Sequence, residues 1–280
     1  MKINLYLVGS ILFAVALVLC VTAAAMLIPA SEKGISRGRA ETLPVIERSI
    51  EDKDYLVLTP PGLGKIVFIH YKKGFAKPPW AGGGKKETSC YKFLGKGVKW
   101  KELPIDYVID PDNSYGLTED FIASAIHAGA EEWDEHTSAE LFGTYSIEHD
   151  ASWDNDAPDG RNELLFGNYS EEGVIAVTVV WGYFYGPPSE RKIIEFDVLF
   201  DTDYVWGNAD PNNDEVTDNP DVMDLQNIAT HEIGHGVGLA DLYDTVCSEE
   251  TMYGYSDYGE VKKRSLNSGD IAGIQELYGA

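Results

Sequence analysis

The sequence predicts an α+β fold from about Cys90 to the C-terminus, preceded by a small β-rich N-terminal segment. The run Val174–Trp181 is rich in β-branched residues, which is typical of a strand in a sheet. Between Leu117 and His136 the apolar residues follow helical spacing instead. With 280 residues and 44% hydrophobic residues, the chain can bury a sizeable core.

The expected elements can be placed in chain order from periodicity and turn residues. Strands are expected at Tyr55–Leu58, Ile66–Tyr71, Ile105–Ile109, Leu164–Phe166, Val174–Trp181 and Ile193–Phe200. Helices are expected at Leu117–His136, at about Val222–Val237 and at about Ser268–Tyr278, the last capped by Asn267 or Ser268. Pro60-Pro61-Gly62 predicts a turn between the first two strands.

The N-terminal region predicts export. Residues 1–30 contain Lys2, an uncharged, mostly apolar run from Leu5 to Ile28, and small residues at Ala23-Ala24-Ala25. These features indicate either a cleaved signal peptide or a retained membrane anchor, and both place the protein outside the cell or on its surface. Residues 31–86 are interpreted as an extension and linker, and residues 87–280 as the catalytic domain.

Charge is distributed unevenly along the chain. Residues 31–105 carry 15 Lys and Arg against 8 Asp and Glu, whereas residues 106–280 carry 6 against 38. The acidic part would repel phosphate, so a nucleic-acid partner is not expected. The basic extension is expected to dock on the acidic region, and the alternative is a flexible stalk. Whether the extension is an inhibitory propeptide stays open.

The most informative segment runs from His231 to Asp241. On a helix, His231 and His235 lie four residues apart and can present imidazole nitrogens to one zinc ion. Glu232 can hydrogen-bond the zinc-bound water and take its proton as general base. Gly238 lets the chain leave the helix in a tight turn, so that Asp241 can return as the third ligand. This pattern predicts one catalytic zinc and hydrolysis of peptide bonds in a polypeptide substrate.

Two further sites are weaker hypotheses. Cys90 and Cys247 form an even pair and predict a disulfide in an oxidising compartment, the alternative being that Cys90 ligates zinc. A calcium site is expected before the active-site helix, where acidic and amide side chains fall at positions 1, 3, 5, 9 and 12 of an EF-hand-like register. These residues are Asp210, Asn212, Asp214, Asp218 and Asp221.

The zinc motif and its surroundings resemble the metzincins, and most closely the matrixins. The similarity covers about Cys90 to the end and includes Asp224–Thr230 before the motif, Thr251–Tyr255 after it and Asp270–Gly279. The resemblance implies a mixed twisted sheet, an active-site helix, a C-terminal helix and a cleft for extended peptide. It also implies that Met252 underlies the metal and that Val174–Val180 is the edge strand with which substrate pairs. The alternative for Val174–Val180 is an ordinary core strand, since periodicity cannot separate the two.

The sequence departs from the matrixin pattern in places. Asp241 stands where matrixins normally have histidine. Outside the motif, His70, His127 and His136 are interpreted as surface or packing residues. The rival hypothesis is a non-catalytic cell-surface binding module on a metzincin scaffold. Glu232 argues against that module, because a structural zinc site has no use for a base beside an open position.

Overall fold

A computed structural model describes residues 48–49, 55–59, 62–75 and 89–280. The chain divides into two compact units, Met1–Leu43 and Pro44–Ala280, and all described residues belong to the second. The apolar segment interpreted as a signal peptide or anchor lies outside the described residues. In the part of the chain that is described, no helix is long and apolar enough to cross a membrane.

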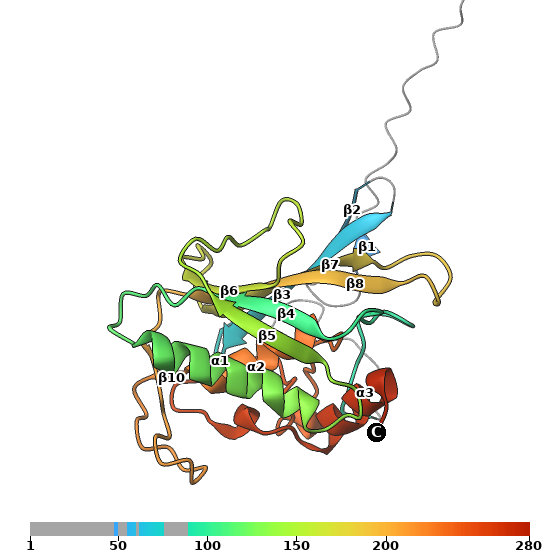
Figure 1. Cartoon of the computed structure of the whole chain (residues 1–280). Helices are drawn as coiled ribbons and strands as arrows, with labels where there is room; N and C mark the ends of the chain where they lie inside the picture. The colour runs from blue at the N-terminus through green and yellow to red at the C-terminus, as the bar shows by residue number, and fades with distance from the viewer. Residues whose placement is uncertain (1–47, 50–54, 60–61, 76–88) are drawn as a thin grey trace, which may run out of the picture. The chain divides into compact units, whose positions relative to one another are not determined.

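A mixed sheet forms the centre of this unit (Figure 1). Its strands follow the order β1-β2-β3-β7-β8-β6-β4-β5, with β11 pairing to the end of β3. Strands β5, β4, β6 and β8 run parallel to one another, whereas β7 is antiparallel to β8 and β3 is antiparallel to β7. The strand bounds are β1 Arg48–Ser49, β2 Tyr55–Thr59, β3 Leu63–Lys72, β4 Ile105–Ile109, β5 Phe142–Ile147, β6 Glu163–Gly167, β7 Val174–Tyr183, β8 Lys192–Asp201 and β11 Tyr255–Ser256.

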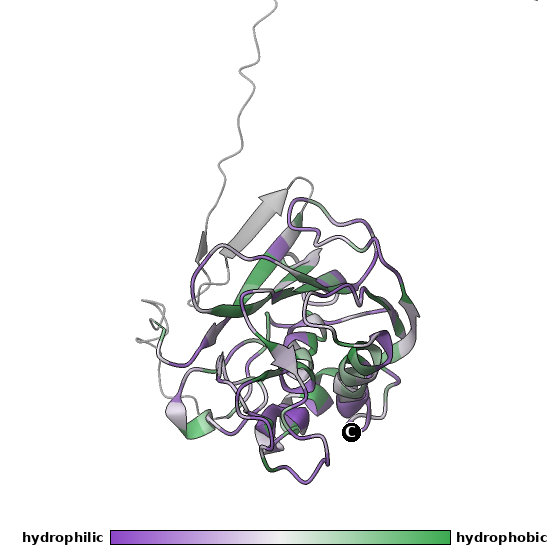
Figure 2. Ribbon diagram, turned by 90° about the vertical axis from the view of Figure 1, so that its left-hand side faces the viewer, coloured by the Kyte–Doolittle hydropathy of each residue, from purple (hydrophilic) through white to green (hydrophobic). Residues whose placement is uncertain are grey.

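Three α-helices lie on one face of the sheet, and the loop between β5 and β6 passes over the other (Figure 1). They are α1 Glu119–Asp134, α2 Leu225–Gly236 and α3 Ser268–Tyr278, and short η1 Thr245–Cys247 and η2 Lys262–Arg264 follow α2. A separate pair, β9 Trp206–Gly207 and β10 Met223–Asp224, precedes α2. Figure 2 shows hydrophobic residues concentrated in the strands and hydrophilic residues in the loops, so the core lies between sheet and helices.

Most expected elements are present with small shifts at their ends. The helix expected at Leu117–His136 is α1, whose N-cap Thr118 accepts a hydrogen bond from the Phe121 amide. The helix expected from Val222 begins only at Leu225, because Asp224 caps it. Asn267 caps α3 in a capping box with Asp270. Periodicity did not indicate β5, whose central residues are exposed, or the two-residue strands.

The expectation that Val174–Val180 is an edge strand is wrong for this structure. Strand β3 pairs with β7 along nearly its whole length, from Leu63 opposite Tyr183 to Tyr71 opposite Val174. Residues 64–71 of β3 are all buried. The side chains of β3 alternate between the two faces of the sheet. Ile66 and Phe68 pack in the main core, whereas Val67 and Ile69 pack in a second cluster on the opposite face, so β3 is buried on both faces.

Candidate metal centre

Helix α2 carries the candidate ligands and is fixed at its first residue. The Asp224 carboxylate accepts a hydrogen bond from the Asn227 amide and caps the helix. Arg264 binds the same carboxylate through two nitrogens, with Nε 2.8 Å from Oδ1 and Nη2 2.5 Å from Oδ2. In this bidentate pair Asp224 is buried and Arg264 is half-buried, and the pair joins the start of the helix to η2.

The structure brings His231, His235 and Asp241 together. Asp241 Oδ1 lies 3.2 Å from His231 Nε2 and 3.6 Å from His235 Nε2. In a tetrahedral zinc site with bonds of about 2.1 Å, ligand atoms lie roughly 3.4 Å apart, so these separations fit zinc. All three atoms are buried, and none has a hydrogen-bond partner among the described residues. Buried polar atoms without partners are unfavourable, which makes the three atoms a fitting donor set for a cation.

The chain reverses after α2 to place Asp241 beside the histidines. Gly238 adopts a φ of 114°, a conformation that a residue with a Cβ rarely adopts. The Leu239 amide then donates to the Gly234 carbonyl, and the Ala240 amide donates to the Lys92 carbonyl. Gly238 therefore lies in the turn that the sequence predicts.

Hydrogen bonds at the second ring nitrogens orient the two histidines. His231 Nδ1 lies 2.7 Å from the Thr251 carbonyl oxygen, and His235 Nδ1 lies 2.9 Å from the Leu239 carbonyl oxygen. A ring that donates from Nδ1 keeps a lone pair at Nε2 for a metal. Burial lowers the pKa of both imidazoles, which favours the neutral form that ligates.

Asp241 is the negative member of the set. Burial alone would raise the pKa of its carboxyl, but His235 and His231 together hold that pKa below its usual range. The carboxylate is thus ionised at neutral pH and partly balances a divalent cation.

Glu232 lies next to the donor set, and both of its carboxylate oxygens are within hydrogen-bond distance of other side chains. Its Oε2 accepts a hydrogen bond of 2.6 Å from the Thr178 hydroxyl of β7, and its Oε1 lies 2.8 Å from Nδ1 of His70 on β3. Burial raises the pKa of Glu232, although His231, His235 and Thr178 partly offset that effect. A raised pKa makes this carboxylate a stronger proton acceptor than an exposed glutamate.

Met252 packs beneath the helix that carries the histidines. A Cβ at Gly234 would lie 2.3 Å from Met252 Sδ and 2.7 Å from Trp133 Cζ2, so the helix approaches both side chains closely. The Met252 and Thr251 amides donate to the Asp270 carboxylate of α3. The segment expected to underlie the metal is therefore anchored to the C-terminal helix.

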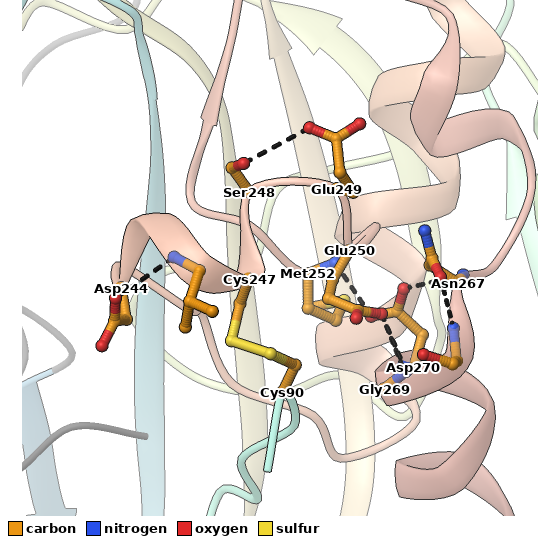
Figure 3. The surroundings of a disulfide bond; sticks show 12 residues. Cys90, Asp244, Cys247, Ser248, Glu249, Glu250, Met252, Asn267, Gly269 and Asp270 are labelled. Carbon is orange, nitrogen blue, oxygen red and sulfur yellow. Dashed lines mark hydrogen bonds between the residues drawn. A yellow bond between two sulfur atoms is a disulfide. The ribbon is translucent and has the colours of Figure 1, made fainter. Parts of the chain in front are cut away.

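Cys90 and Cys247 form the expected disulfide, with Cα atoms 5.3 Å apart (Figure 3). The bond joins the start of the matrixin-like region to η1, between Asp241 and Met252. Because Cys90 is bonded to Cys247, the alternative of Cys90 as a zinc ligand is wrong for this structure.

The residues expected to bind calcium lie in the loop before β10. Asp210 accepts hydrogen bonds from the Asp214 and Glu215 amides, and Asn212 accepts one from the Asp214 amide. Asp218 and Asp221 are exposed. Asp210 and Asn212 thus hold the backbone of their own loop, and calcium binding there stays a prediction.

Sequence reasoning missed two residues that contact Glu232. His70 was interpreted as a surface or packing residue, but it is 1% exposed and its ring lies 4.0 Å from that of His231. Thr178 was treated only as part of a strand. The alternation of Ile66, Phe68 and His70 on one face of a strand was the available signal, since it places a histidine where an apolar residue is expected.

A mixed sheet beside a helix with two histidines and a nearby carboxylate is the arrangement expected of a matrixin-like domain. The chain belongs to the matrixin family, because the family profile matches residues 99–279. Matrix metalloproteinase-16 from rat, human and mouse is 34% identical over 97 residues in each case. That stretch covers 35% of this chain and 14% of each relative. Strand β3 and His70 lie outside the family match.

Proposed function

We propose that the protein is a zinc-dependent endopeptidase in which Glu232 is the general base. The observation that carries this proposal is the convergence of three buried, unpartnered ligand atoms beside a buried carboxylate. His231 Nε2, His235 Nε2 and Asp241 Oδ1 would hold the zinc ion. When bound, zinc supplies a Lewis acid that polarises the scissile carbonyl and makes water more acidic.

The chain's own groups support the proton transfers of such a reaction. The Thr178 hydroxyl binds Oε2 of Glu232, so Oε1 would be the oxygen that exchanges a proton once its contact with His70 is broken. Glu232 would take a proton from the attacking water and deliver it to the leaving amine. The hydrogen bonds from His231 and His235 to backbone carbonyls fix the two rings, so that their Nε2 atoms would be available to hold the metal.

The acidic loop before β10 is proposed to hold calcium, and residues 1–30 are proposed to export the chain, either as a signal peptide or as an anchor. The disulfide supports an extracellular or cell-surface location, since such bonds persist in oxidising compartments. A polypeptide is the proposed substrate.

Digestion of casein and of a peptide library, with and without a chelator, tests the function. Hydrolysis should stop on chelation and return with added zinc, and Asp241→Ala should lower zinc content. Both the untreated chain and a preparation nicked by limited trypsin treatment should be assayed. A chain that binds zinc but cleaves nothing in either preparation would favour the non-catalytic binding module.

A further inference from the structure

Strand β3 lies along β7, the strand with which the matrixin resemblance implies that an extended peptide would pair. Among the described residues, β7 has β8 on one side and β3 on the other, so no free ladder edge is left on β7. At its C-terminal end β3 also pairs with β11 in parallel, through Tyr71 opposite Tyr255. A peptide can add to β7 by strand pairing only if β3 leaves.

The inward face of β3 contacts the groups proposed for catalysis. Phe68 stacks on His235 with ring centroids 3.9 Å apart and planes 7° from parallel. His70 packs on His231 and places Nδ1 2.8 Å from Oε1 of Glu232, the oxygen proposed to exchange a proton. The residues His231, Glu232 and His235 are 0% exposed. Water and substrate therefore have no access to these groups while β3 is in place.

The outward face of β3 and the residue that follows its C-terminal end also contact the rest of the domain. Val67 and Ile69 pack with residues of β7 and with Trp153 of the β5–β6 loop. Lys73 forms an ion pair with Glu260, and the Lys73 amide donates to the Ser256 carbonyl. These contacts join the basic extension to the acidic domain.

We propose that β3 is an intramolecular inhibitor strand that fills the substrate cleft, with His70 holding Glu232, and that the protein is latent in this form. The inference rests on the proposed peptidase function. A strand from the same chain has a high effective concentration at the cleft, so a substrate in trans must compete with it. Activity then requires the displacement of β3.

Two substitutions in the zinc-loaded full-length protein separate the roles of His70 and of the strand. His70→Ala frees Glu232, and we expect about 10-fold faster peptide hydrolysis from the lost contact. Ile69→Pro removes a backbone donor within the strand but leaves the inward face intact, and we expect an increase on the order of 10- to 100-fold. His149→Ala is the matched control, because His149 is an exposed histidine that pairs with Asp112 and not with Glu232.

Hydrogen exchange supplies a readout that does not depend on turnover. The amides of residues 63–72 should be protected in the zinc-loaded wild type and should exchange faster when an apolar tripeptide hydroxamate is added. Amides of α1 should keep their protection, which also verifies that Ile69→Pro remains folded.

The outcomes separate this inference from the proposed function. Released β3 amides, together with faster hydrolysis by His70→Ala, support the inhibitor strand. Hydroxamate binding with β3 still protected, or equal rates for His70→Ala, His149→Ala and wild type, overturns it. If no variant hydrolyses any peptide, the peptidase function fails, and the exchange result alone decides whether β3 covers the cleft.

Discussion

Nδ1 of His70 lies 2.8 Å from Oε1 of Glu232, although the two residues are 162 positions apart in the chain. His70 belongs to a strand outside the matrixin match, whereas Glu232 lies at the centre of the candidate site. The contact links the basic extension directly to the proposed general base. It also means that the carboxylate of Glu232 is hydrogen-bonded to the chain itself in the described structure.

The Cys90–Cys247 bond should contribute strongly to stability. It closes a loop with a sequence separation of 157 residues, and the chain-entropy argument gives about 4–5 kcal/mol for such a loop. In urea denaturation, the Cys90→Ser/Cys247→Ser variant should have a free energy of unfolding lower than that of the wild type by about this amount. Reductant should destabilise the wild type and leave the variant unchanged. Equal stability of the two proteins under oxidising conditions would contradict this assignment.

Gly234→Ala should destabilise the domain through Met252. The new methyl group would meet Met252 Sδ at 2.3 Å, and overpacking of this kind costs about 1–3 kcal/mol. The better helix propensity of alanine offsets up to about 1 kcal/mol of that cost. A double-mutant cycle with Met252→Ala measures the coupling by chemical denaturation. If Gly234→Ala costs the same in both backgrounds, Met252 does not limit the approach of α2.

The local features of the site could be predicted from sequence because each depends on short-range spacing. The four-residue interval between His231 and His235 and the glycine at 238 determine ligand geometry within one helix and one turn. The Cys90–Cys247 pair followed from counting cysteines. The position of β3 could not be predicted, because strand periodicity shows which face is apolar but not which strand will be its neighbour. Contact between His70 and Glu232 depends on that neighbour.

Glu195 and Asp197 should make stability depend on pH. Burial raises the pKa of Glu195 to about 7 and, together with the Glu195 carboxylate, raises that of Asp197 to about 9. The unfolded chain loses both protons near pH 4, so the folded protein binds more protons between about pH 4 and 9. The unfolding free energy should therefore fall as pH rises through this window.

The substitution Glu195→Gln should remove much of the fall in unfolding free energy with rising pH. At pH 8 the variant should be more stable than the wild type by on the order of 1 kcal/mol, a value reduced for partial solvent screening. Near pH 4 the two proteins should be equally stable. Thermal melts from pH 4 to 9, without divalent cations other than zinc, provide the measurement. If the Tm values of variant and wild type change in parallel with pH, Glu195 is not the origin of the pH dependence.

The calcium hypothesis for the loop before β10 can be tested against a second acidic cluster. Asp210 should be required, so calcium should raise the Tm of the zinc-loaded wild type but not that of Asp210→Asn. Glu195→Gln is the control, because Asp154, Glu195 and Asp197 also lie close enough to share an ion. A Tm shift that survives in Asp210→Asn and disappears in Glu195→Gln would place the ion on the sheet instead.

Zinc content and peptide hydrolysis, measured together on Glu232→Ala, test the proposed mechanism most directly. The substitution should be made in the His70→Ala background, so that the contact of His70 with Glu232 is absent from both proteins compared. The expected result is one zinc ion per chain in both proteins and a loss of hydrolysis of about 10²–10⁴-fold in Glu232→Ala, the usual contribution of a general base. Undiminished hydrolysis by the zinc-loaded Glu232→Ala protein would contradict the mechanism.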